Sequence, residues 1–295
     1  MRKPSIHTGR YLLFLAAALL TLSLAACAKK DPRFTYDVNE ISTGSTGEPA
    51  ETDPGSTLAS WDLGRADAYK EDDDCTDEEL LEKWLAVEGL TEKDLTIRGC
   101  RQLVLVVLKK GYASIDTTVC YEKSSTGKWK SAAGLRRMMG HTGSNGISHD
   151  RVQGDMTSPA GLWRLGPCFG IKPKPEGLKM PWRDVTHQSD WVGDNDSIYY
   201  NTWQERDDPA VSGKWDYDEV EHLEDYKGSY DLSCVIRFNM YPYTRRYAGS
   251  AIFFHSGNGS TAGCIALPSN DLKNVFLWMD PAKNPYILIS GYQQH

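Results

Sequence analysis

Basic charge is scarce in this chain of 295 residues, in which 33 Lys and Arg stand against 40 Asp and Glu and the net charge is −7. A protein that recognises nucleic acid normally presents a basic face, so this balance argues against a nucleic-acid partner. Repeated long apolar runs are also missing, which excludes a polytopic membrane protein. The 40% of hydrophobic residues still suffices for a sizeable core, so we expect one or two globular domains.

Closely spaced cysteines are absent as well. After Cys27, no cysteine lies two to four residues from another. The clustered Cys and His pairs that hold zinc are therefore missing, and we expect no metal site. Outside the cytoplasm, isolated cysteines of this kind would by default pair as disulfides.

The N-terminus has the pattern of an export signal. Residues 1–10 are basic, and residues 11–26 are uncharged, mostly apolar and short for a membrane span. The end of this run, Leu-Ala-Ala before Cys27, resembles the lipobox of bacterial lipoproteins, in which the signal is cut before an acylated cysteine. We expect residues 1–26 to be a signal peptide and lipid on Cys27 to anchor the protein to a bacterial membrane, outside the cytoplasm. The alternative is an ordinary secreted protein.

Composition changes again beyond the signal. Residues 27–60 are rich in Pro, Gly, Ser, Thr and acidic residues, with few large apolar residues, and predict a disordered tether. Residues 61–100 predict a small helical element. In it, Thr76 and Glu79 have the spacing of a capping box and precede an apolar stripe of helical period.

From residue 101 onward the pattern is that of strands. Continuous or alternating apolar runs predict strands at 102–108, 113–121, 231–238, 250–255 and 286–290. A helix with Ser269 as its cap is expected before Pro281. The fold class is therefore mostly β, with one helix near the C-terminal end. Residues 170–230 show little periodicity.

Two reactive residue types stand close together near the C-terminus. Cys264 follows His255 by nine residues, and the Gly-rich segment 256–259 lies between them. A tight turn there would bring thiol and imidazole within hydrogen-bond reach. A free thiol has a pKa of about 8.5, and a neighbouring imidazolium lowers it until thiolate is present near neutral pH. Gly263 leaves backbone N–H groups open to an incoming oxygen. The pattern indicates a cysteine nucleophile.

The segment 249–267, GSAIFFHSGNGSTAGCIAL, resembles the active-site signature of the L,D-transpeptidase catalytic-domain family. In that family a strand ends in His-Gly and is followed, after a loop, by Ser/Thr-x-Gly-Cys-Ile/Val-Arg. Segments 102–121, 154–161 and 280–289 resemble the same family, so the similarity covers about 101–291. It implies a β-sandwich-like or barrel-like catalytic domain over that range.

The resemblance also implies residue roles. Cys264 is the nucleophile, and His255 is its base and later the proton donor. Thr261 matches the position whose backbone carbonyl orients the His ring, and N–H groups around Gly263 and Cys264 would hold the oxyanion. The family cleaves the L,D amide bond after the third residue of a peptidoglycan stem peptide. It passes the acyl group to an amine of a neighbouring stem, giving a 3–3 cross-link. No cofactor is needed, and carbapenems would acylate the cysteine.

The sequence departs from the family pattern at several positions. The residue after the His is Ser256, the residue before Gly-Cys is Ala262, and Ala266 stands where the family has Arg. The missing Arg leaves open how the substrate carboxylate is held, and four cations are candidates to replace it: Arg237, Arg245, Arg246 and Lys273. We expect Ser256 and Asp155 to border the substrate, with Asp155 mainly stabilising a turn.

Three functions are compatible with this sequence. The first is an L,D-transpeptidase, the second an L,D-carboxypeptidase that uses the same pair with water as acceptor, and the third a non-catalytic wall-binding lipoprotein. The intact pair of Cys264 and His255 weighs against the third. Transfer and hydrolysis share every step up to the acyl-enzyme, so the sequence does not separate the first two. We expect a monomer in either case.

The remaining cysteines are expected to form two disulfides. Cys75 and Cys100 bracket the helical element, and closing a loop of that length would stabilise the fold by roughly 3 kcal/mol. Cys168 and Cys234 could meet across the sheet. Cys120 would then remain as a buried strand thiol.

Overall fold

The computed structural model describes residues 70–292. The predicted signal peptide at 1–26, the lipidation site Cys27 and the predicted tether at 27–60 lie outside the described residues. Within the described range, no helix is long and apolar enough to cross a membrane.

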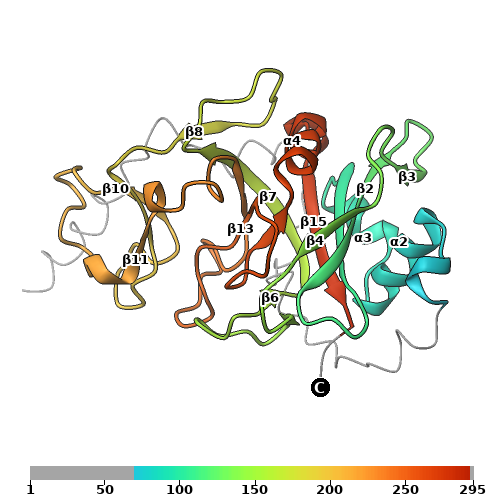
Figure 1. The fold of residues 1–295 in the computed structure, drawn as a ribbon, viewed down its shortest axis with the longest axis horizontal. Coiled ribbons are helices and arrows are strands. Elements are labelled where there is room, and N and C mark those ends of the chain that lie inside the picture. The colour runs from blue at the N-terminus through green and yellow to red at the C-terminus, as the bar shows by residue number, and fades with distance from the viewer. Residues whose placement is uncertain (1–69, 293–295) are drawn as a thin grey trace, which may run out of the picture. The chain divides into compact units, whose positions relative to one another are not determined.

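Helices come first along the described chain. They are η1 (Asp72–Asp74), α2 (Asp77–Val87) and α3 (Glu92–Ile97). The predicted capping box starts α2: the N–H of Glu79 donates to Thr76 Oγ1, and the N–H of Thr76 donates to Glu79 Oε2. Its apolar stripe is buried in a cluster with the outward side chains of neighbouring strands. The described part of the predicted helical element at 61–100 is therefore helical, and Figure 1 shows it beside the sheet, whereas residues 61–69 lie outside the described residues.

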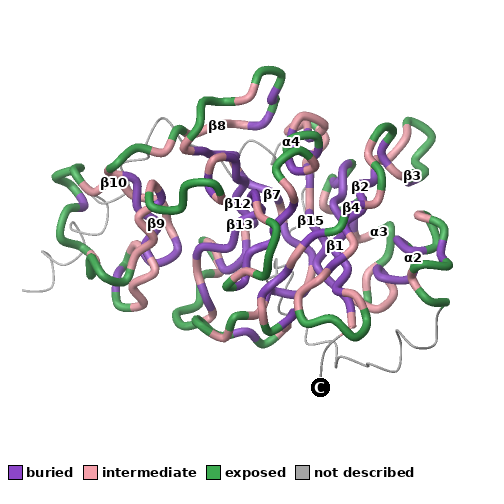
Figure 2. Tube along the Cα trace, viewed as in Figure 1, coloured by how far each residue is buried: buried purple, intermediate pink, exposed green. Residues whose placement is uncertain are grey.

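The body is a closed, barrel-like sheet, which confirms the predicted mostly β fold class. Hydrogen-bonded neighbours run in the order β1-β15-β7-β12-β13-β14-β4-β2, and β2 pairs back to β1. The strands are β1 (Gln102–Leu108), β2 (Ile115–Lys123), β4 (Met138–His141), β7 (Gly161–Gly170), β12 (Ser233–Ile236), β13 (Phe253–Ser256), β14 (Ile265–Leu267) and β15 (Pro285–Gly291). Two further strands, β3 (Trp129–Ser131) and β8 (Trp182–Asp184), extend β2 and β7. In Figure 2 these central strands are the most continuously buried part of the chain.

A second, smaller sheet lies within residues 170–230, where the sequence shows little periodicity. Its strands are β9 (Ser189–Val192), β10 (Trp203–Glu205) and β11 (Val220–His222), with β9 in the middle. The short helices η2 (Tyr217–Glu219) and η3 (Leu223–Asp225) flank β11. Trp191 packs edge-on against Phe253 of β13, with ring centroids 4.9 Å apart, so this sheet is attached to the strand that carries the predicted base.

The remaining elements are short. A two-stranded pair, β5 (Ile147–Ser148) and β6 (Ser158–Pro159), braces the Gly-rich loop between them. The C-terminal helix is α4 (Ser269–Trp278), and η4 (Pro281–Lys283) follows it. Ser269 is the first helical residue rather than the cap, because Pro268 holds the cap position. The predicted apolar face of α4 closes the interior of the sheet.

The six described cysteines are all free thiols, so neither predicted disulfide is formed. Cys75 Sγ donates to the carbonyl oxygen of Glu71 at 3.4 Å, and Cys100 Sγ donates to that of Gln102 at 3.2 Å. The two thiols are therefore engaged by carbonyls of different segments, and not by each other. Cys168 and Cys234 do lie directly opposite each other on β7 and β12, as expected, but as unbonded thiols.

Candidate active site

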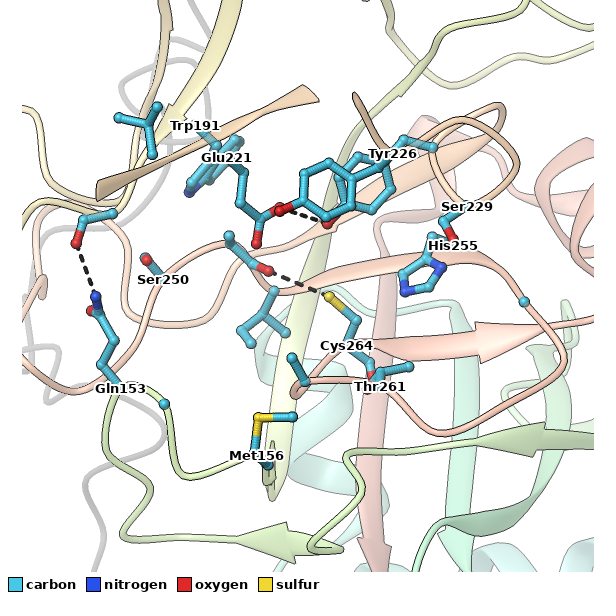
Figure 3. A pocket seen from close by; sticks show the side chains of 18 of the residues that line it. Gln153, Met156, Trp191, Glu221, Tyr226, Ser229, Ser250, His255, Thr261 and Cys264 are labelled. Carbon is cyan, nitrogen blue, oxygen red and sulfur yellow. Dashed lines mark hydrogen bonds between the residues drawn. The ribbon is translucent and has the colours of Figure 1, made fainter. Parts of the chain in front are cut away.

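Cys264 and His255 line the same pocket, which has a volume of about 730 Å³ (Figure 3). Its walls come from four regions of the sequence: the Gly-rich loop around 151–156, residues 191–195 at the end of β9, the β11 region, and the chain on either side of β13. Within the described residues, Arg151 is the only Lys or Arg that lines it. Acidic and aromatic side chains of the β11 region face it from the other side.

Parallel strands, and not a tight hairpin turn, bring the pair together. β13 and β14 run parallel, with His255 opposite Ala266, so residues 257–264 carry the chain back along β13 before β14 begins. Side chains alternate between the two faces of a strand. Phe254 and Ile265 therefore point into the core, whereas His255 and Cys264 lie on the pocket side.

The thiol of Cys264 is held by two backbone groups. Its Sγ donates to the carbonyl oxygen of Ala251 at 3.3 Å and accepts from the N–H of Phe253 at 3.3 Å. Ala251 is fixed in turn, because its N–H donates to Asn201 Oδ1 and its φ is 54°. The structure contains no hydrogen bond between the thiol and the imidazole. Catalytic hydrogen bonds of this kind often form only when substrate is bound.

The imidazole of His255 has a defined tautomer. Its Nδ1 lies 2.8 Å from the carbonyl oxygen of Ser256. A carbonyl oxygen only accepts, so Nδ1 carries the hydrogen and Nε2 keeps its lone pair. The ring also packs edge-on against Tyr230, with ring centroids 5.6 Å apart. His255 is thus arranged as a base that acts through Nε2.

The resting pair is neutral, which corrects the expected thiolate. Burial raises the pKa of the Cys264 thiol to about 12, and the carboxyl of Glu221 adds to this rise, whereas the Phe253 N–H and the Arg151 charge oppose it. Burial lowers the pKa of His255, although its bond to the Ser256 carbonyl acts in the opposite direction. No imidazolium is therefore present at neutral pH to stabilise a thiolate, and the proton must move during the reaction.

Comparison with known proteins agrees with this geometry. Residues 103–287 match the family model of the L,D-transpeptidase catalytic domain, YkuD. The chain belongs to the L,D-transpeptidase catalytic-domain family. No curated relative matches the sequence. Members of this family are cysteine-dependent transpeptidases, and membership implies peptidoglycan as the substrate.

Thr261 has a different role from the one that the family resemblance implied. Its carbonyl oxygen accepts from the N–H of Ser144, and the His255 ring is oriented instead by the carbonyl of Ser256. Its hydroxyl instead donates to the Cys264 carbonyl at 2.6 Å and accepts from the Gly263 N–H at 3.0 Å. The side chain of Thr261 therefore fixes the turn that carries the nucleophile, and Ser256 orients the base.

The position of Gly263 requires glycine because of its backbone conformation, and not because its N–H is free. That N–H donates to Thr261 Oγ1, so the prediction that it would be open to an oxyanion is wrong. Gly263 has a φ of +142°, and a Cβ there would lie 2.8 Å from the Thr157 carbonyl oxygen. Only glycine fits this conformation without strain.

The two predicted substrate contacts lie away from the pocket lining. Ser256 is 4% exposed and contributes only its carbonyl to the site. Asp155 stabilises a turn, as expected: its carboxylate accepts from the N–H groups of Val152 and Thr157 and from the Thr157 hydroxyl. These bonds leave Asp155 as a brace for the loop rather than a substrate contact.

Sequence reasoning missed Arg151. Its side chain is only 4% exposed, its nearest carboxylate is Asp155 Oδ1 at 3.8 Å, and its Nε and Nη1 have no hydrogen-bond partner. A Cβ added to Gly263 would lie 3.3 Å from Arg151 Nη2, which places the guanidinium beside the nucleophile turn. None of the four cations considered from the sequence lines the pocket. The available signal was that Arg151 is the only Lys or Arg in the loop 140–161.

Proposed function

We propose that this protein is an L,D-transpeptidase that forms 3–3 cross-links between peptidoglycan stem peptides through a thioester on Cys264. The observation that carries the proposal is the placement of Cys264 and His255 in one pocket of a family catalytic domain. A carbapenem, as a substrate mimic, would acylate the same sulfur.

The geometry supports the following course for the reaction. The thiol leaves the Ala251 carbonyl, and its proton passes to Nε2 of His255 as sulfur attacks the carbonyl after the third stem residue. The imidazolium is stabilised by the Nδ1 hydrogen bond to Ser256 and then donates its proton to the departing D-Ala amine. The N–H of Cys264 and the charge of Arg151 are the groups available to the developing oxyanion.

The N-terminal sequence supports a further part of the proposal. Residues 1–26 direct export, and lipid on Cys27 holds the catalytic domain at a membrane face outside the cytoplasm, where its substrate is assembled into wall. Residues 27–60 then serve as the tether between the membrane anchor and the folded part of the chain. Cys27→Ser should release the protein from the membrane fraction without changing its activity in detergent extracts.

The function is tested with the full chain extracted in mild detergent. It is incubated with disaccharide tetrapeptides, and the products are separated and weighed by mass spectrometry. We expect 3–3 dimers and free D-Ala from the wild type and neither from Cys264→Ala. His255→Ala should lower turnover by about two orders of magnitude, the scale of a lost general base.

Two outcomes would change the assignment. Tripeptides without dimers would identify an L,D-carboxypeptidase with water as the acceptor. Intact tetrapeptides, together with wall binding that survives in Cys264→Ala, would identify a non-catalytic wall-binding protein. Cys120→Ala is the matched control, because Cys120 is a buried thiol of β2 outside the pocket lining and its loss should leave the products unchanged.

A further inference from the structure

Glu221 faces the nucleophile from the small sheet. It lies on β11, opposite Trp191 of β9, and lines the pocket together with Cys264 and His255. In Figure 3 its carboxylate points into the pocket on the side of Cys264. After burial, the charge of the Glu221 carboxyl is the main cause that raises the pKa of the Cys264 thiol, in keeping with their places in one pocket.

Tyr230 links Glu221 to the base. The Tyr230 hydroxyl donates to Glu221 Oε2 at 2.6 Å, and the same ring packs edge-on against His255 with a centroid separation of 5.6 Å. The ring of Tyr226 stacks on that of Tyr230, with ring centroids 4.8 Å apart, and so packs against the hydroxyl donor of Glu221. The carboxyl of Glu221 is therefore held at a fixed place across the pocket from the imidazole.

The carboxyl of Glu221 lacks a cationic partner within residues 70–292. Tyr230 supplies its side-chain hydrogen bond, and burial raises the pKa of Glu221 to about 7. Removing a carboxylate partly from water without a counter-charge is unfavourable. A positively charged ligand in the pocket would offset that cost, which is how a site selects an ammonium group over neutral water.

We propose that Glu221 binds the primary ammonium group of the acyl acceptor and takes one of its protons, which directs the acyl-enzyme to an amine and not to water. This inference rests on the proposed function and names the residue that receives the acceptor amine at the same site. It also gives the small sheet a role, because this sheet brings the carboxylate to the pocket.

The step balances as follows. The acceptor arrives as an ammonium group with three N–H hydrogens beside the Glu221 carboxylate. One proton passes to Glu221, and the nitrogen attacks the thioester carbonyl carbon. The C–N bond forms, the C–S bond breaks, and a second proton reaches the departing sulfur through His255. The products are an amide with one N–H, the Cys264 thiol and the protonated carboxyl of Glu221, which returns its proton to water.

The test separates the two half-reactions. The full chain in detergent is mixed with a stem tetrapeptide that carries a side-chain amine on its third residue. Thioester formation is followed by intact-protein mass, and the dimer-to-tripeptide ratio is measured at steady state. We expect Glu221→Gln to form the thioester at a rate within about twofold of the wild type but to lower that ratio at least tenfold, since a lost general base typically costs at least that much.

Two further variants make the result specific. Glu221→Asp keeps a carboxylate and should recover part of the ratio. Glu224→Gln removes the same charge two residues beyond β11, outside the pocket lining, and should keep the wild-type ratio.

Three outcomes would overturn the inference. One is an unchanged ratio in Glu221→Gln, and another is a parallel loss of thioester and dimer. The third is a dimer-to-tripeptide ratio that falls as far in Glu224→Gln as in Glu221→Gln. A wild type that forms no thioester, or only tripeptide, would instead refute the proposed function, and the two failures are therefore distinguishable.

Discussion

The carbonyl oxygen of Ser256 lies 2.8 Å from Nδ1 of His255, so the base is oriented by the residue that follows it. The hydroxyl of Thr261 is thereby left to hold the nucleophile turn through the Cys264 carbonyl and the Gly263 N–H. This division of roles leads to the first prediction.

Thr261→Ala should slow acylation of Cys264 by up to about thirtyfold, because it removes two hydrogen bonds, each with a net contribution of about 1 kcal/mol. Thr261→Ser keeps the hydroxyl and should acylate at nearly the wild-type rate. The measurement is the rate of mass increase with a carbapenem or a tetrapeptide. If Thr261 acted only through its carbonyl, Thr261→Ala would match the wild type.

The neutral resting pair leads to a second prediction, about alkylation. Because burial raises the pKa of Cys264 to about 12, little thiolate exists near neutral pH. Iodoacetamide should label Cys264 in the folded protein at least about a hundredfold more slowly at pH 8 than in urea, where an ordinary cysteine pKa of about 8.5 applies. Labelling should still be rising at pH 10. Peptide mapping gives the rate for this cysteine alone, and a plateau near pH 8 would contradict the neutral pair.

Much of the fold could be predicted from the sequence, since it follows from local patterns. The apolar run at 102–108 is β1, and the run at 286–290 lies within β15. The capping box of Thr76 and Glu79 fixes the start of α2. The apolar periodicity that predicts these strands and the capping residues that predict the helix start are both formed by residues close together in the sequence.

The pocket could be predicted only in part. Cys264 and His255 are close in sequence, whereas Arg151 and Glu221 reach the pocket through sheet pairing that no local pattern encodes. β11 is three residues long and half-buried throughout, so it shows no alternation. The parallel pairing of β13 and β14 is likewise a tertiary feature, and the short Gly-rich connection gave the impression of a turn. The Cys75–Cys100 pairing was wrong because sequence spacing does not show where a thiol points, whereas Cys168 and Cys234 meet across the sheet as expected but remain unbonded.

A third prediction concerns Arg151, whose charge opposes the rise in the Cys264 pKa. Arg151→Gln should slow acylation by about tenfold, the effect of about 1.4 kcal/mol in transition-state stabilisation. The same variant should also shift the increase in the iodoacetamide labelling rate of Cys264 to higher pH. Arg151→Lys keeps the charge and should leave that rise near its wild-type position, although its head group lacks the planar fork of Arg.

Arg246→Gln is the matched control for Arg151. Arg246 is half-exposed, pairs with Asp196 at 3.5 Å and lies outside the pocket lining, so its loss should alter neither readout. Thermal melts establish that each variant is folded. Equal alkylation profiles for Arg151→Gln and the wild type would remove Arg151 from the site.

The last prediction concerns stability and Asp116, a fully buried carboxyl on β2. Its Oδ1 accepts from the Thr118 hydroxyl at 2.8 Å, and its Oδ2 has no partner. Burial raises the pKa of Asp116 to about 8, well above its value of about 3.9 in an unfolded chain. Between these values the unfolded chain loses the proton while the folded protein keeps it. The stability that Asp116 contributes is therefore complete below pH 4 and is lost as pH rises towards 8.

Asp116→Asn is neutral at every pH and should remove this part of the decline. We expect the urea midpoint of the wild type to fall between pH 5.5 and pH 8.5, and that of the variant to fall less. Glu221 acts in the same direction, because burial also raises its pKa, so some slope remains. Asp73→Asn, at a side chain that is 80% exposed, is the control and should keep the wild-type slope. Tryptophan fluorescence reports each midpoint, and equal slopes for Asp116→Asn and the wild type would show that Asp116 is ionised in the folded protein.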